Sequence, residues 1–373
     1  MSKVVFYSSF IRPGGGPAGY VFNLMKAAEN GTTKNTFLFC GYKIDDRSLN
    51  SDTWPFLLKV KAELAWRGVY FPLFPDLLEL KDMADGAIVA IHGHVHPRLV
   101  YTLKKRARKI IFMPHSPSLH CDEYVMLCAS SGGRLSKRRF EYFRWAEHVS
   151  IAYSDHVVFP SPRAGLVYKQ AYRDQLNLGK DHYIPSGVYC NIDDESVVRS
   201  YTKESNRREI KVGFIGRYNI HKGFDIYCRV AEKMSSVSLR FLSFGDGPLK
   251  PIPGCVDNRG WVNDISSAIL ECDIILVPNK VSYYDLLPLE AACHGRPIVF
   301  TPVGGNIDQA ESLPDSVLCK SVSVDDVVSG IEEAVTRKSL DYSWGIKNGE
   351  KYLEFFTEKA MLNRWDEFIN AIA

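Results

Sequence analysis

The stretch KVGFIGRYNIHKG, residues 211–223, decides the fold of this chain. It opens with a short apolar run of the kind that forms a buried strand in a parallel sheet. Gly216 and Arg217 stand at the carboxyl end of the predicted strand, and Lys222 and Gly223 come just before the next predicted helix. A strand that leads through a glycine loop into a helix is typical of doubly wound α/β domains, which bind ligands beyond the carboxyl ends of their strands.

The same alternation of short apolar runs with longer amphipathic stretches extends along the chain on both sides of this segment. A polar, aperiodic segment at residues 195–209 divides the runs into two series, which predicts two doubly wound domains joined by a linker. The predicted strands are Val4–Ser8, Thr36–Cys40, Ala87–Ile91, Lys109–Met113, His156–Phe159 and His182–Ile184 in the first series, and Lys211–Ile215, Leu239–Phe244, Ile274–Pro278, Pro297–Thr301 and Ser316–Leu318 in the second.

The chain has 373 residues, of which 46% are apolar and 24% are charged. This balance is typical of a folded protein of two or three domains and excludes disordered, collagenous and fibrous chains. No apolar run reaches the roughly 18–20 residues of a membrane-spanning helix, and residues 1–10 lack the features of a signal peptide. The nine cysteines are scattered, which predicts small buried side chains rather than a disulfide or zinc framework. We therefore expect a soluble, cytoplasmic protein.

Positive charge is concentrated in the first half of the chain. Residues 1–200 carry 26 Lys and Arg against 19 Asp and Glu, whereas residues 201–373 carry 20 against 24. The segment Lys104–Arg144 alone has ten basic and three acidic residues, which indicates an anionic partner. Its second basic run, Lys137–Trp145, interleaves aromatic residues, as does a helix on an anionic membrane surface. The alternatives are a solvated helix whose aromatic side chains face the core, and nucleic-acid binding, for which no recognised module is present.

The first predicted strand ends in a glycine loop that matches the dinucleotide-binding pattern G-x-G-x-x-G through Gly14, Gly16 and Gly19. Glycines let backbone N–H groups approach a phosphate or a sugar at the start of a helix. Pro17 removes one such N–H group, and no acidic residue ends the second predicted strand. Binding of a nicotinamide or flavin cofactor is therefore the weaker interpretation, and a glycine turn without a ligand is a further alternative.

Four more segments carry motifs in the second half of the chain. They are Phe244–Pro248 (FGDGP), Gly260–Val262 (GWV), Ser282–Pro297 (SYYDLLPLEAACHGRP) and Thr301–Gly305 (TPVGG). Together with residues 211–223 and the N-terminal glycine loop, these motifs resemble the GT-B glycosyltransferases of family four, which are retaining enzymes that use nucleotide-diphosphate sugars. The resemblance covers nearly the whole chain.

The resemblance implies an α/β chain of the GT-B type, in which two Rossmann-like doubly wound domains face each other across a cleft. Residues 1–195 would form the N-terminal, acceptor-binding domain. Residues 205–352 would form the C-terminal domain that binds the nucleotide sugar. A C-terminal helix within residues 353–373 would cross back to the N-terminal domain.

Carried over residue by residue, the resemblance assigns the donor site to the second domain. Arg217 and Lys222 would neutralise the donor diphosphate and stabilise the leaving nucleotide. Glu290 would hold the ribose hydroxyls, and backbone N–H groups near Leu286 and Leu287 would bind the diphosphate. Fixed cations and helix-end dipoles can stabilise the charge that develops on a diphosphate, so no metal and no cofactor is expected beside the nucleotide-diphosphate sugar, which is a co-substrate.

The resemblance also assigns residues outside this segment. The loop with Trp261 would border the base of the nucleotide. In the first domain, Gly15 and Gly16 would lie beside the donor. His115, which follows the predicted strand Lys109–Met113, stands where the family has an active-site histidine.

The sequence departs from the family at Ser282. The family typically has two glutamates in this segment, and Ser282 occupies the position of the first, which faces the donor sugar. Asp285 could substitute in part, although its place at the start of a helix is expected to turn its side chain elsewhere. Three interpretations stay open: an unusual donor such as a deoxy sugar, an ordinary donor that is held differently, and weakened or lost catalysis.

His92, His94 and His96 alternate directly after the predicted strand Ala87–Ile91. Alternating residues share one face of a strand, so a metal site is one interpretation. No acidic residue is adjacent. The alternatives are histidines that line the cleft or bind the acceptor, and structural histidines with satisfied hydrogen bonds.

The resemblance therefore implies a hexosyl- or deoxyhexosyltransferase that moves a sugar, with retention, from a nucleotide-diphosphate donor to a hydroxyl of a glycan or lipid-linked glycan acceptor. Bacterial surface polysaccharide of the O-antigen or capsule type is the expected product. Peripheral contact with the inner face of the cytoplasmic membrane through Lys104–Arg144 is expected, and nucleic acid is not an expected partner. The alternatives are a catalytically weakened scaffold subunit and an NAD-dependent oxidoreductase that uses the N-terminal glycines.

Overall fold

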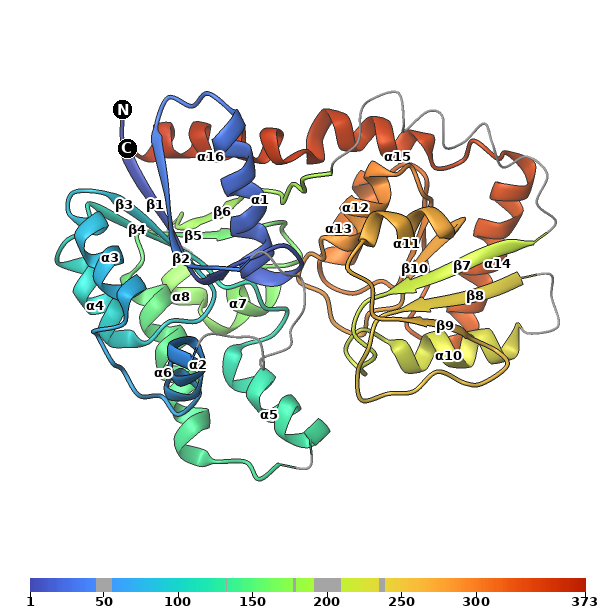
Figure 1. The fold of residues 1–373 in the computed structure, drawn as a ribbon, viewed down its shortest axis with the longest axis horizontal. Coiled ribbons are helices and arrows are strands. Elements are labelled where there is room, and N and C mark those ends of the chain that lie inside the picture. Colours follow the sequence, from blue (N-terminus) through green and yellow to red (C-terminus); the bar gives the residue numbers. More distant parts are fainter. Residues whose placement is uncertain (45–55, 132, 177–178, 191–208, 235–238) are drawn as a thin grey trace. The chain divides into compact units, whose positions relative to one another are not determined.

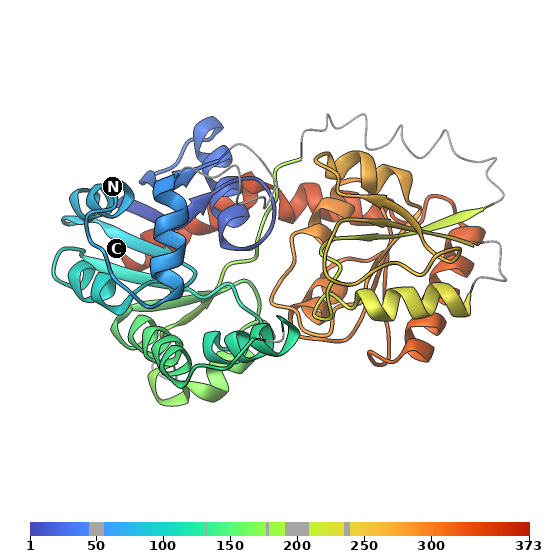
Figure 2. The same ribbon diagram turned by 60° about the horizontal axis from the view of Figure 1, so that its bottom comes forward.

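The structure, a computed structural model, describes the 373-residue chain except for residues 45–55, 132, 177–178, 191–208 and 235–238 (Figures 1 and 2). The chain divides into two compact units. Unit 1 comprises Met1–Ser186 and Glu358–Ala373, and unit 2 comprises Gly187–Thr357. The polar segment 195–209 is expected to join two domains. Its residues 195–208 lie outside the described residues. The domain boundaries within it stay a prediction.

Unit 1 is built on a parallel sheet of six strands in the order β2-β1-β3-β4-β5-β6. The strands are β1 (Lys3–Ile11), β2 (Thr36–Lys43), β3 (Ile88–His92), β4 (Lys109–Met113), β5 (His156–Phe159) and β6 (Asp181–Tyr183). The central strands β3 and β4 read IVAIH and KIIFM and are buried almost throughout, as parallel strands that are covered on both faces must be. All six overlap strands that the sequence predicts.

Helices cover both faces of this sheet (Figure 1). They are α1 (Gly16–Asn30), α2 (Phe56–Trp66), α3 (Pro75–Ala84), α4 (Pro97–Lys104), α5 (His120–Ser131), α6 (Lys137–Tyr153), α7 (Leu166–Ala171), α8 (Arg173–Leu176) and α16 (Glu358–Ile372). Helix α16 packs beside α1, and its Trp365 is completely buried. Unit 1 therefore takes its last helix from the end of the chain, after unit 2 in sequence.

Unit 2 has a second parallel sheet of six strands, in the order β12-β11-β10-β7-β8-β9. The strands are β7 (Ile210–Ile215), β8 (Leu239–Phe244), β9 (Asp257–Gly260), β10 (Ile274–Val277), β11 (Ile298–Phe300) and β12 (Ser316–Leu318). Five of them overlap predicted strands. The sixth, β9, reads DNRG and has no apolar pattern that would indicate a strand. Its pairing with β8 at the edge of the sheet makes it one.

The helices of unit 2 are α10 (Phe224–Lys233), α11 (Ile265–Glu271), α12 (Leu287–Cys293), α13 (Gly305–Ser312), α14 (Val324–Leu340), α15 (Ile346–Lys351) and the π-helical turn η2 (Tyr352–Phe356). The helix predicted over residues 353–373 is interrupted at Thr357, whose extended backbone bridges to Val188. The nine cysteines are free, and seven of them are buried. Among the described helices, none has the length and apolar content that a membrane span requires.

Each sheet reverses its strand order at one place, which we call the switch point. In unit 1 it lies between β1 and β3, and in unit 2 it lies between β7 and β10. The connections that leave the two strands of a switch point run in opposite directions, and ligands bind between them at the carboxyl ends of the strands. The loops after β1 and β3, and after β7 and β10, are therefore where a functional site is expected.

Candidate functional site

The loops after β7 and β10 bring a lysine and an aspartate together at the switch point of unit 2. Nζ of Lys222 lies 2.5 Å from Oδ2 of Asp285, and the amide of Asn279 donates to the same oxygen at 2.6 Å. Burial acts to raise the pKa of Asp285, but the charge of Lys222 and the two hydrogen bonds outweigh burial and lower the pKa. Asp285 is therefore a carboxylate at neutral pH, and it forms an ion pair with Lys222. The carboxylate of Asp285 thus faces Lys222, and whether it turns away from the donor sugar stays a prediction.

Gly223 determines the position of Lys222. The backbone of Gly223 is left-handed, with φ 68°, and a Cβ there would lie 1.8 Å from the carbonyl oxygen of Pro278, just after β10. Only glycine combines this conformation with so close an approach. The backbone N–H of Lys222 donates to the side chain of Asn219 at 2.9 Å. The loop thus holds the lysine against the neighbouring strand end.

Arg217 lies on the same loop, directly after Gly216, and is solvent-exposed. Its carbonyl oxygen accepts the N–H of Asn219 at 2.9 Å, which helps to curve the loop. Arg217 thus lies at the carboxyl end of β7. The resemblance requires a group at this place that reaches a diphosphate. Its convergence with Lys222 on one diphosphate stays a prediction.

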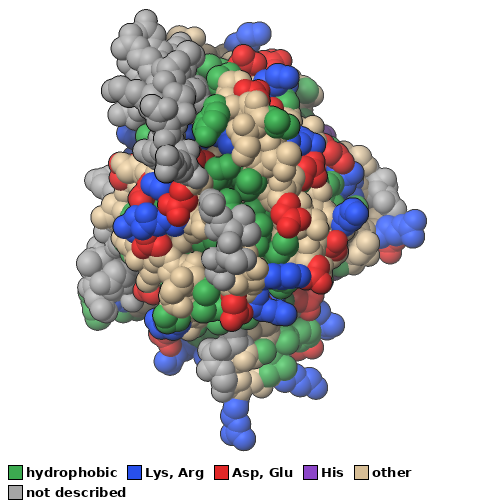
Figure 3. Space-filling view, turned by 90° about the vertical axis from the view of Figure 1, so that its right-hand side faces the viewer, with side chains coloured by type: hydrophobic (Ala, Val, Ile, Leu, Met, Phe, Trp, Pro, Cys, Tyr) green, Lys and Arg blue, Asp and Glu red, His purple; other side chains and the backbone are tan. Residues whose placement is uncertain are grey.

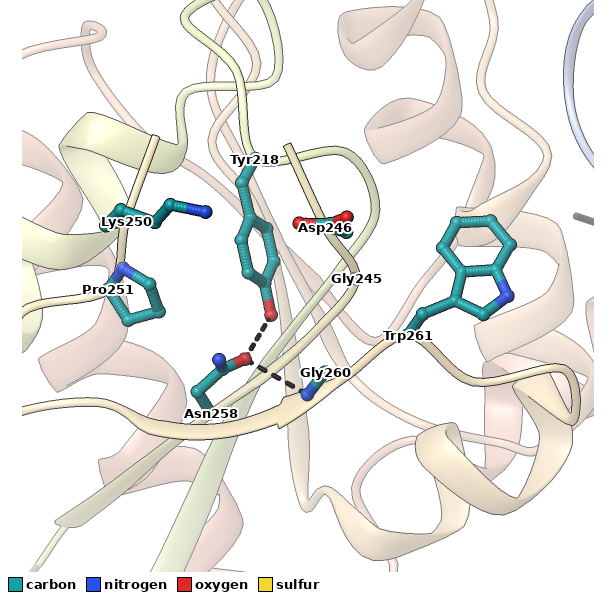
Figure 4. Close-up of a pocket in the computed structure, with 8 residues that line it drawn as sticks. All are labelled: Tyr218, Gly245, Asp246, Lys250, Pro251, Asn258, Gly260 and Trp261. Carbon is teal, nitrogen blue, oxygen red and sulfur yellow. Dashed lines mark hydrogen bonds between the residues drawn. The ribbon is translucent and has the colours of Figure 1, made fainter. Parts of the chain in front are cut away.

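A polar pocket of about 160 Å³ lies beyond the carboxyl ends of β7, β8 and β9 (Figure 4). Tyr218 follows β7, Asp246 and Lys250 follow β8, and β9 itself contributes Asn258. The hydroxyl of Tyr218 donates to Oδ1 of Asn258 at 2.8 Å, and the N–H of Gly260 donates to the same oxygen at 3.0 Å. Because a backbone N–H can only donate, these bonds determine which end of the amide is the oxygen.

Trp261 borders this pocket, and 46% of its surface is exposed. Its Nε1–H donates to Oδ1 of Asn263 at 3.1 Å, which restrains the indole ring. An exposed aromatic face beside polar groups suits a planar ligand such as a nucleobase. The sequence indicates Trp261 but not Tyr218 or Asn258. Recognition of strand β9 could have found them, but the sequence of β9 has no apolar pattern that would indicate a strand.

Helix α12 carries three other residues that the resemblance assigns to the donor. Leu286 is its N-cap, Leu287 is its first residue, and Glu290 is half-buried in its first turn. The N–H groups of Leu289 and Glu290 donate to the carbonyl oxygen of Leu286, and Pro288 has no N–H group. The other N–H groups at this helix start, those of Leu286 and Leu287, are the ones that the resemblance assigns to the diphosphate.

Ser282 is only 6% exposed, and its Oγ has no hydrogen-bond partner among the described residues. Its carbonyl oxygen accepts the N–H of Gly305 at 3.2 Å, and a Cβ on Gly304 would lie 2.0 Å from that oxygen. Ser282 is therefore packed against the glycine turn at the start of α13. Its place beside the donor sugar stays a prediction.

In unit 1, the loop after β1 is open at its glycines. Gly15 is the N-cap of α1 and Gly16 has φ 70°, and a Cβ at either position would meet nothing within 4 Å. A Cβ at Gly19, inside α1, would instead lie 1.5 Å from the carbonyl oxygen of Gly14. The helix thus packs tightly on the loop, while Gly15 and Gly16 remain exposed. Their backbone is accessible to a ligand.

His115 follows β4 with φ 58°, and it is the only non-glycine residue with positive φ in the described part of the chain. Its Nε2 lies 2.8 Å from Nδ1 of His92 at the end of β3. Its ring contacts that of Tyr20 in α1, with centroids 5.0 Å apart. Burial lowers the pKa of His92 to about 3, and burial together with the neighbouring ring lowers the pKa of His115 well below its usual value. Both rings are therefore neutral at pH 7.

The three alternating histidines do not share a strand face. Strand β3 ends at His92, and the residues after it leave the sheet. His94 contacts the hydroxyl of Tyr142 at 3.3 Å, whereas His96 caps α4 by accepting the N–H of Arg98. The shared face that a metal site would need is therefore not formed. No cluster of three or more His, Cys, Asp or Glu that could hold a metal ion occurs within the described residues.

Comparisons with known proteins bear on the fold and on one segment of the chain. Residues 209–337 match the family model described as Glycosyl transferases group 1, and this segment contains Lys222, Asp285 and the polar pocket. A relative from Klebsiella pneumoniae, described as an uncharacterized 41.2 kDa protein in the cps region, is 20% identical over 223 residues. The match covers 58% of this chain and 56% of the relative, so the chain spans little more than half the length of that protein.

Solved structures share the fold at low sequence identity. Sucrose-phosphate synthase from Thermosynechococcus elongatus has a TM-score of 0.65 at 14% identity, over 100% of this chain and 99% of that chain. Anabaena HepE in complex with UDP-glucose has a TM-score of 0.63 at 12% identity, over 100% of both chains. The predicted fold class, two Rossmann-like doubly wound domains of the GT-B type, is thus confirmed. The chain thus has the GT-B fold, and its residues 209–337 match the group 1 glycosyltransferase model.

Proposed function

We propose that this protein is a retaining glycosyltransferase that moves a sugar from a nucleotide-diphosphate donor to a hydroxyl of a glycan or lipid-linked glycan. The observation that carries the proposal is the ion pair of Lys222 and Asp285 at the switch point of unit 2. Cleavage of the sugar–phosphate bond leaves negative charge on the diphosphate, and a preorganised ammonium stabilises that charge in the transition state. The complex of HepE with UDP-glucose supports a nucleotide sugar as the donor class.

The donor would occupy the carboxyl edge of the second sheet. The base would stack on Trp261, and the ribose hydroxyls would bind Glu290. The diphosphate would meet Lys222, Arg217 and the N–H groups at the start of α12. Because Lys222 already holds a carboxylate, the phosphate would replace Asp285 or share the ammonium with it. These cations supply the charge that the leaving diphosphate needs, so we propose a reaction without a metal or other cofactor.

In unit 1, the proposal assigns acceptor binding to the unit and makes His115 the active-site histidine, while the place of Gly15 and Gly16 beside the donor stays a prediction. Gly15 and Gly16 expose backbone groups, and His115 is a neutral ring that can form hydrogen bonds. Neutral donors and acceptors bind sugar hydroxyls without adding charge. The relative in the cps region of Klebsiella pneumoniae supports bacterial surface polysaccharide, of the O-antigen or capsule type, as the product.

Peripheral contact with an anionic membrane is a second part of the proposal, and α6 is not the helix that best supports it. Phe143 is buried, and Phe140 and Tyr142 pack around it against α5. Exposed apolar side chains occur instead at the start of α2 and in the segment after it, where Phe56 is 77% exposed and Leu73 61%. Phe140, Tyr142 and Phe143 therefore belong to the core, and another surface is the better candidate.

We name this candidate the α2 surface; it consists of Phe56, Leu57, Val69, Phe71 and Leu73. The basic start of α6 is close to it, because the guanidinium of Arg139 lies over the ring of Trp66 at the end of α2, 5.3 Å from its centroid. Exposed Lys137 and Arg138 precede Arg139. Apolar side chains beside cations suit the interface of an anionic bilayer. By contrast, the face in Figure 3 mixes basic and acidic side chains.

A ligand screen tests the enzymatic proposal. The protein is melted with UDP, GDP, dTDP, CMP or NADH, and one nucleoside diphosphate is expected to raise the melting temperature because it binds only the folded state. Transfer from the matching nucleotide sugar to a glycan, followed by NMR of the anomeric proton, then examines retention. Stabilisation by NADH alone would favour the oxidoreductase, and nucleotide binding without transfer would favour the scaffold subunit.

Vesicle sedimentation tests the membrane proposal. The protein is expected to bind vesicles of phosphatidylcholine with phosphatidylglycerol and not vesicles of phosphatidylcholine alone. The double substitution Phe56→Ser and Leu73→Ser should abolish binding. Leu340→Ser removes an exposed leucine from unit 2 and is the matched control. Equal binding by both variants would refute the assignment of the α2 surface.

A further inference from the structure

His115 is held by buried side chains from three different elements of unit 1. A non-glycine residue with φ 58° persists only where its surroundings determine its conformation. His92, at the end of β3, contacts a ring nitrogen of His115, and Tyr20 of α1 packs against the ring. Trp365 of α16 binds Tyr20 in turn. All three side chains are completely or almost completely buried.

The environment of His92 determines which nitrogen of His115 carries the proton. Nε2 of His92 is buried and has no hydrogen-bond partner among the described residues. A buried N–H without an acceptor is less tolerable than a lone pair without a donor, so the proton of His92 belongs on Nδ1, which faces Nε2 of His115. Nε2 of His115 is then the acceptor. A neutral imidazole has one N–H group, which His115 therefore keeps on Nδ1.

Tyr20 and Trp365 restrain the orientation of this pair. The indole N–H of Trp365 donates to the hydroxyl of Tyr20 at 2.7 Å. The ring of Tyr20 lies 5.3 Å from that of His92 with the planes 30° apart, and 5.0 Å from that of His115 at 63°. Trp365 also contacts His92 directly, with centroids 5.9 Å apart. Rotation of either imidazole would have to displace a buried aromatic ring from a close-packed interior.

We propose that Tyr20, His92 and Trp365 are positioning residues that hold His115 as a neutral hydrogen-bond donor with its proton on Nδ1. The use of this donor in sugar transfer rests on the proposed function, whereas the tautomer and its orientation do not. A neutral N–H can bind an oxygen of either sugar without placing a cation near the positive charge that develops at an anomeric carbon. Trp365 thereby makes the last helix of the chain a support of the site.

The first test does not depend on activity. The full-length protein is labelled with ¹⁵N in its histidines, and long-range proton–nitrogen correlation at pH 7 shows which ring nitrogen is protonated. His92→Phe and His115→Phe assign the two sets of signals. We expect Nδ1–H for both residues. A proton on Nε2 of His115, or a mixture of its tautomers, would overturn the proposal.

The second test compares two substitutions on α16. Trp365→Phe keeps an aromatic ring but removes the donor to Tyr20, whereas Ile369→Val removes one methyl group from a completely buried position of the same helix. We expect Trp365→Phe to shift the signals of both histidines and to lower kcat about tenfold, with KM changed by less than about twofold. Ile369→Val should leave the signals and kcat as they are.

The outcomes of these tests separate the inference from the proposed function. Unchanged signals in Trp365→Phe, or equal changes in Trp365→Phe and Ile369→Val, would show that Trp365 only packs and would overturn its positioning role. Shifted signals with normal kcat would overturn its importance for transfer. If the unsubstituted protein transfers no sugar, the proposed function fails, and the tautomer spectrum still decides whether the histidine pair is held as we propose.

Discussion

The two switch points of this chain share a strand arrangement but differ in electrostatics. In unit 2, Lys222 and Asp285 form an ion pair whose side chains are 35% and 24% exposed. In unit 1, His92 is buried and His115 is half-buried, and both rings are neutral because desolvation lowers the pKa of each. The doubly wound fold thus provides the location of a site, whereas the loop residues and their contact with water decide its chemistry.

The difference agrees with the two tasks of the proposed reaction. Negative charge develops on the leaving diphosphate, and the partly hydrated edge of the second sheet tolerates the ions that stabilise it. Sugar hydroxyls carry no charge, and the neutral groups of unit 1 suit them. Substitutions in either unit can therefore test this difference.

Loss of the cations in unit 2 is expected to have the largest effect. Lys222→Ala and Arg217→Ala should each lower kcat by roughly 10²–10³-fold, the usual loss for one group that stabilises developing charge. Steady-state kinetics with the nucleotide sugar measures the change. Lys233→Ala removes a lysine that pairs with Asp325 on the surface of the same unit, and kcat should stay the same. Near-normal turnover in both site variants would contradict the assigned roles.

Ser282→Glu separates donor choice from packing. Because Ser282 is buried, a carboxylate at this position should lower the free energy of unfolding by about 3 kcal/mol, through lost hydration without a new partner. Ser282→Ala removes a hydroxyl that has no partner among the described residues, and it should change stability by less than about 1 kcal/mol. Chemical denaturation measures both. A stable Ser282→Glu variant with a new preference for nucleotide sugar would mean that this residue faces the donor.

Trp261→Ala tests the pocket at the edge of unit 2. Stacking of a base on an aromatic ring contributes about 1–3 kcal/mol, so the Kd of the nucleotide selected in the ligand screen should rise about tenfold. The same contact exists in the ground state and the transition state, so kcat should change little. Trp145→Ala removes a similarly exposed tryptophan from unit 1 and should leave the Kd unchanged. Calorimetric titration that finds equal affinity in Trp261→Ala would exclude the base from this pocket.

His92→Phe tests whether the ring of His92 is neutral in the folded protein, through the pH dependence of stability. The pKa of His92 in the folded protein, about 3, is below its ordinary value of 6.5. Below pH 6.5 the unfolded chain therefore binds a proton that the folded protein does not, and stability is lost as pH falls toward 3. The slope from this ring is about 1.4 kcal/mol per pH unit. Denaturation between about pH 5.5 and about pH 4, where the unfolded ring is protonated and the folded ring is not, should show a slope smaller by this amount in His92→Phe; equal slopes would mean that the folded ring is protonated.

Most strands of the fold are predictable because their apolar runs are strong. Strands β4, β5, β8 and β12 occupy the residues that the sequence predicts. Strand β9 is not predictable, because its residues are polar and only its pairing with β8 makes it a strand. This omission matters for the candidate site, since β9 carries Asn258 and leads into Trp261. The sequence motifs therefore contain several residues of the pocket, but they give a role there only to Trp261 and they miss Asn258.

At the candidate site, too, the sequence predicts part of the arrangement and the tertiary structure decides the rest. Spacing and resemblance place Lys222 and Asp285 after two strands, but they do not show that these strands are neighbours in the sheet. The parallel pairing of β10 with β7 brings the two side chains together. The alternation of His92, His94 and His96 misleads for a related reason. A period of two has meaning only within a strand, and β3 ends at His92.

By itself the sequence determined the fold class, the two series of strands and helices, and the loops that carry polar residues. Hydrophobic periodicity and glycine spacing are local properties, and they can be read without knowing which elements touch. Only the tertiary structure decided which of these residues meet, and which of them are charged. Strand order joins Lys222 to Asp285, and burial keeps His115 neutral beside His92. Both depend on contacts between segments that are distant in the chain, and on the exclusion of water, which no local pattern encodes.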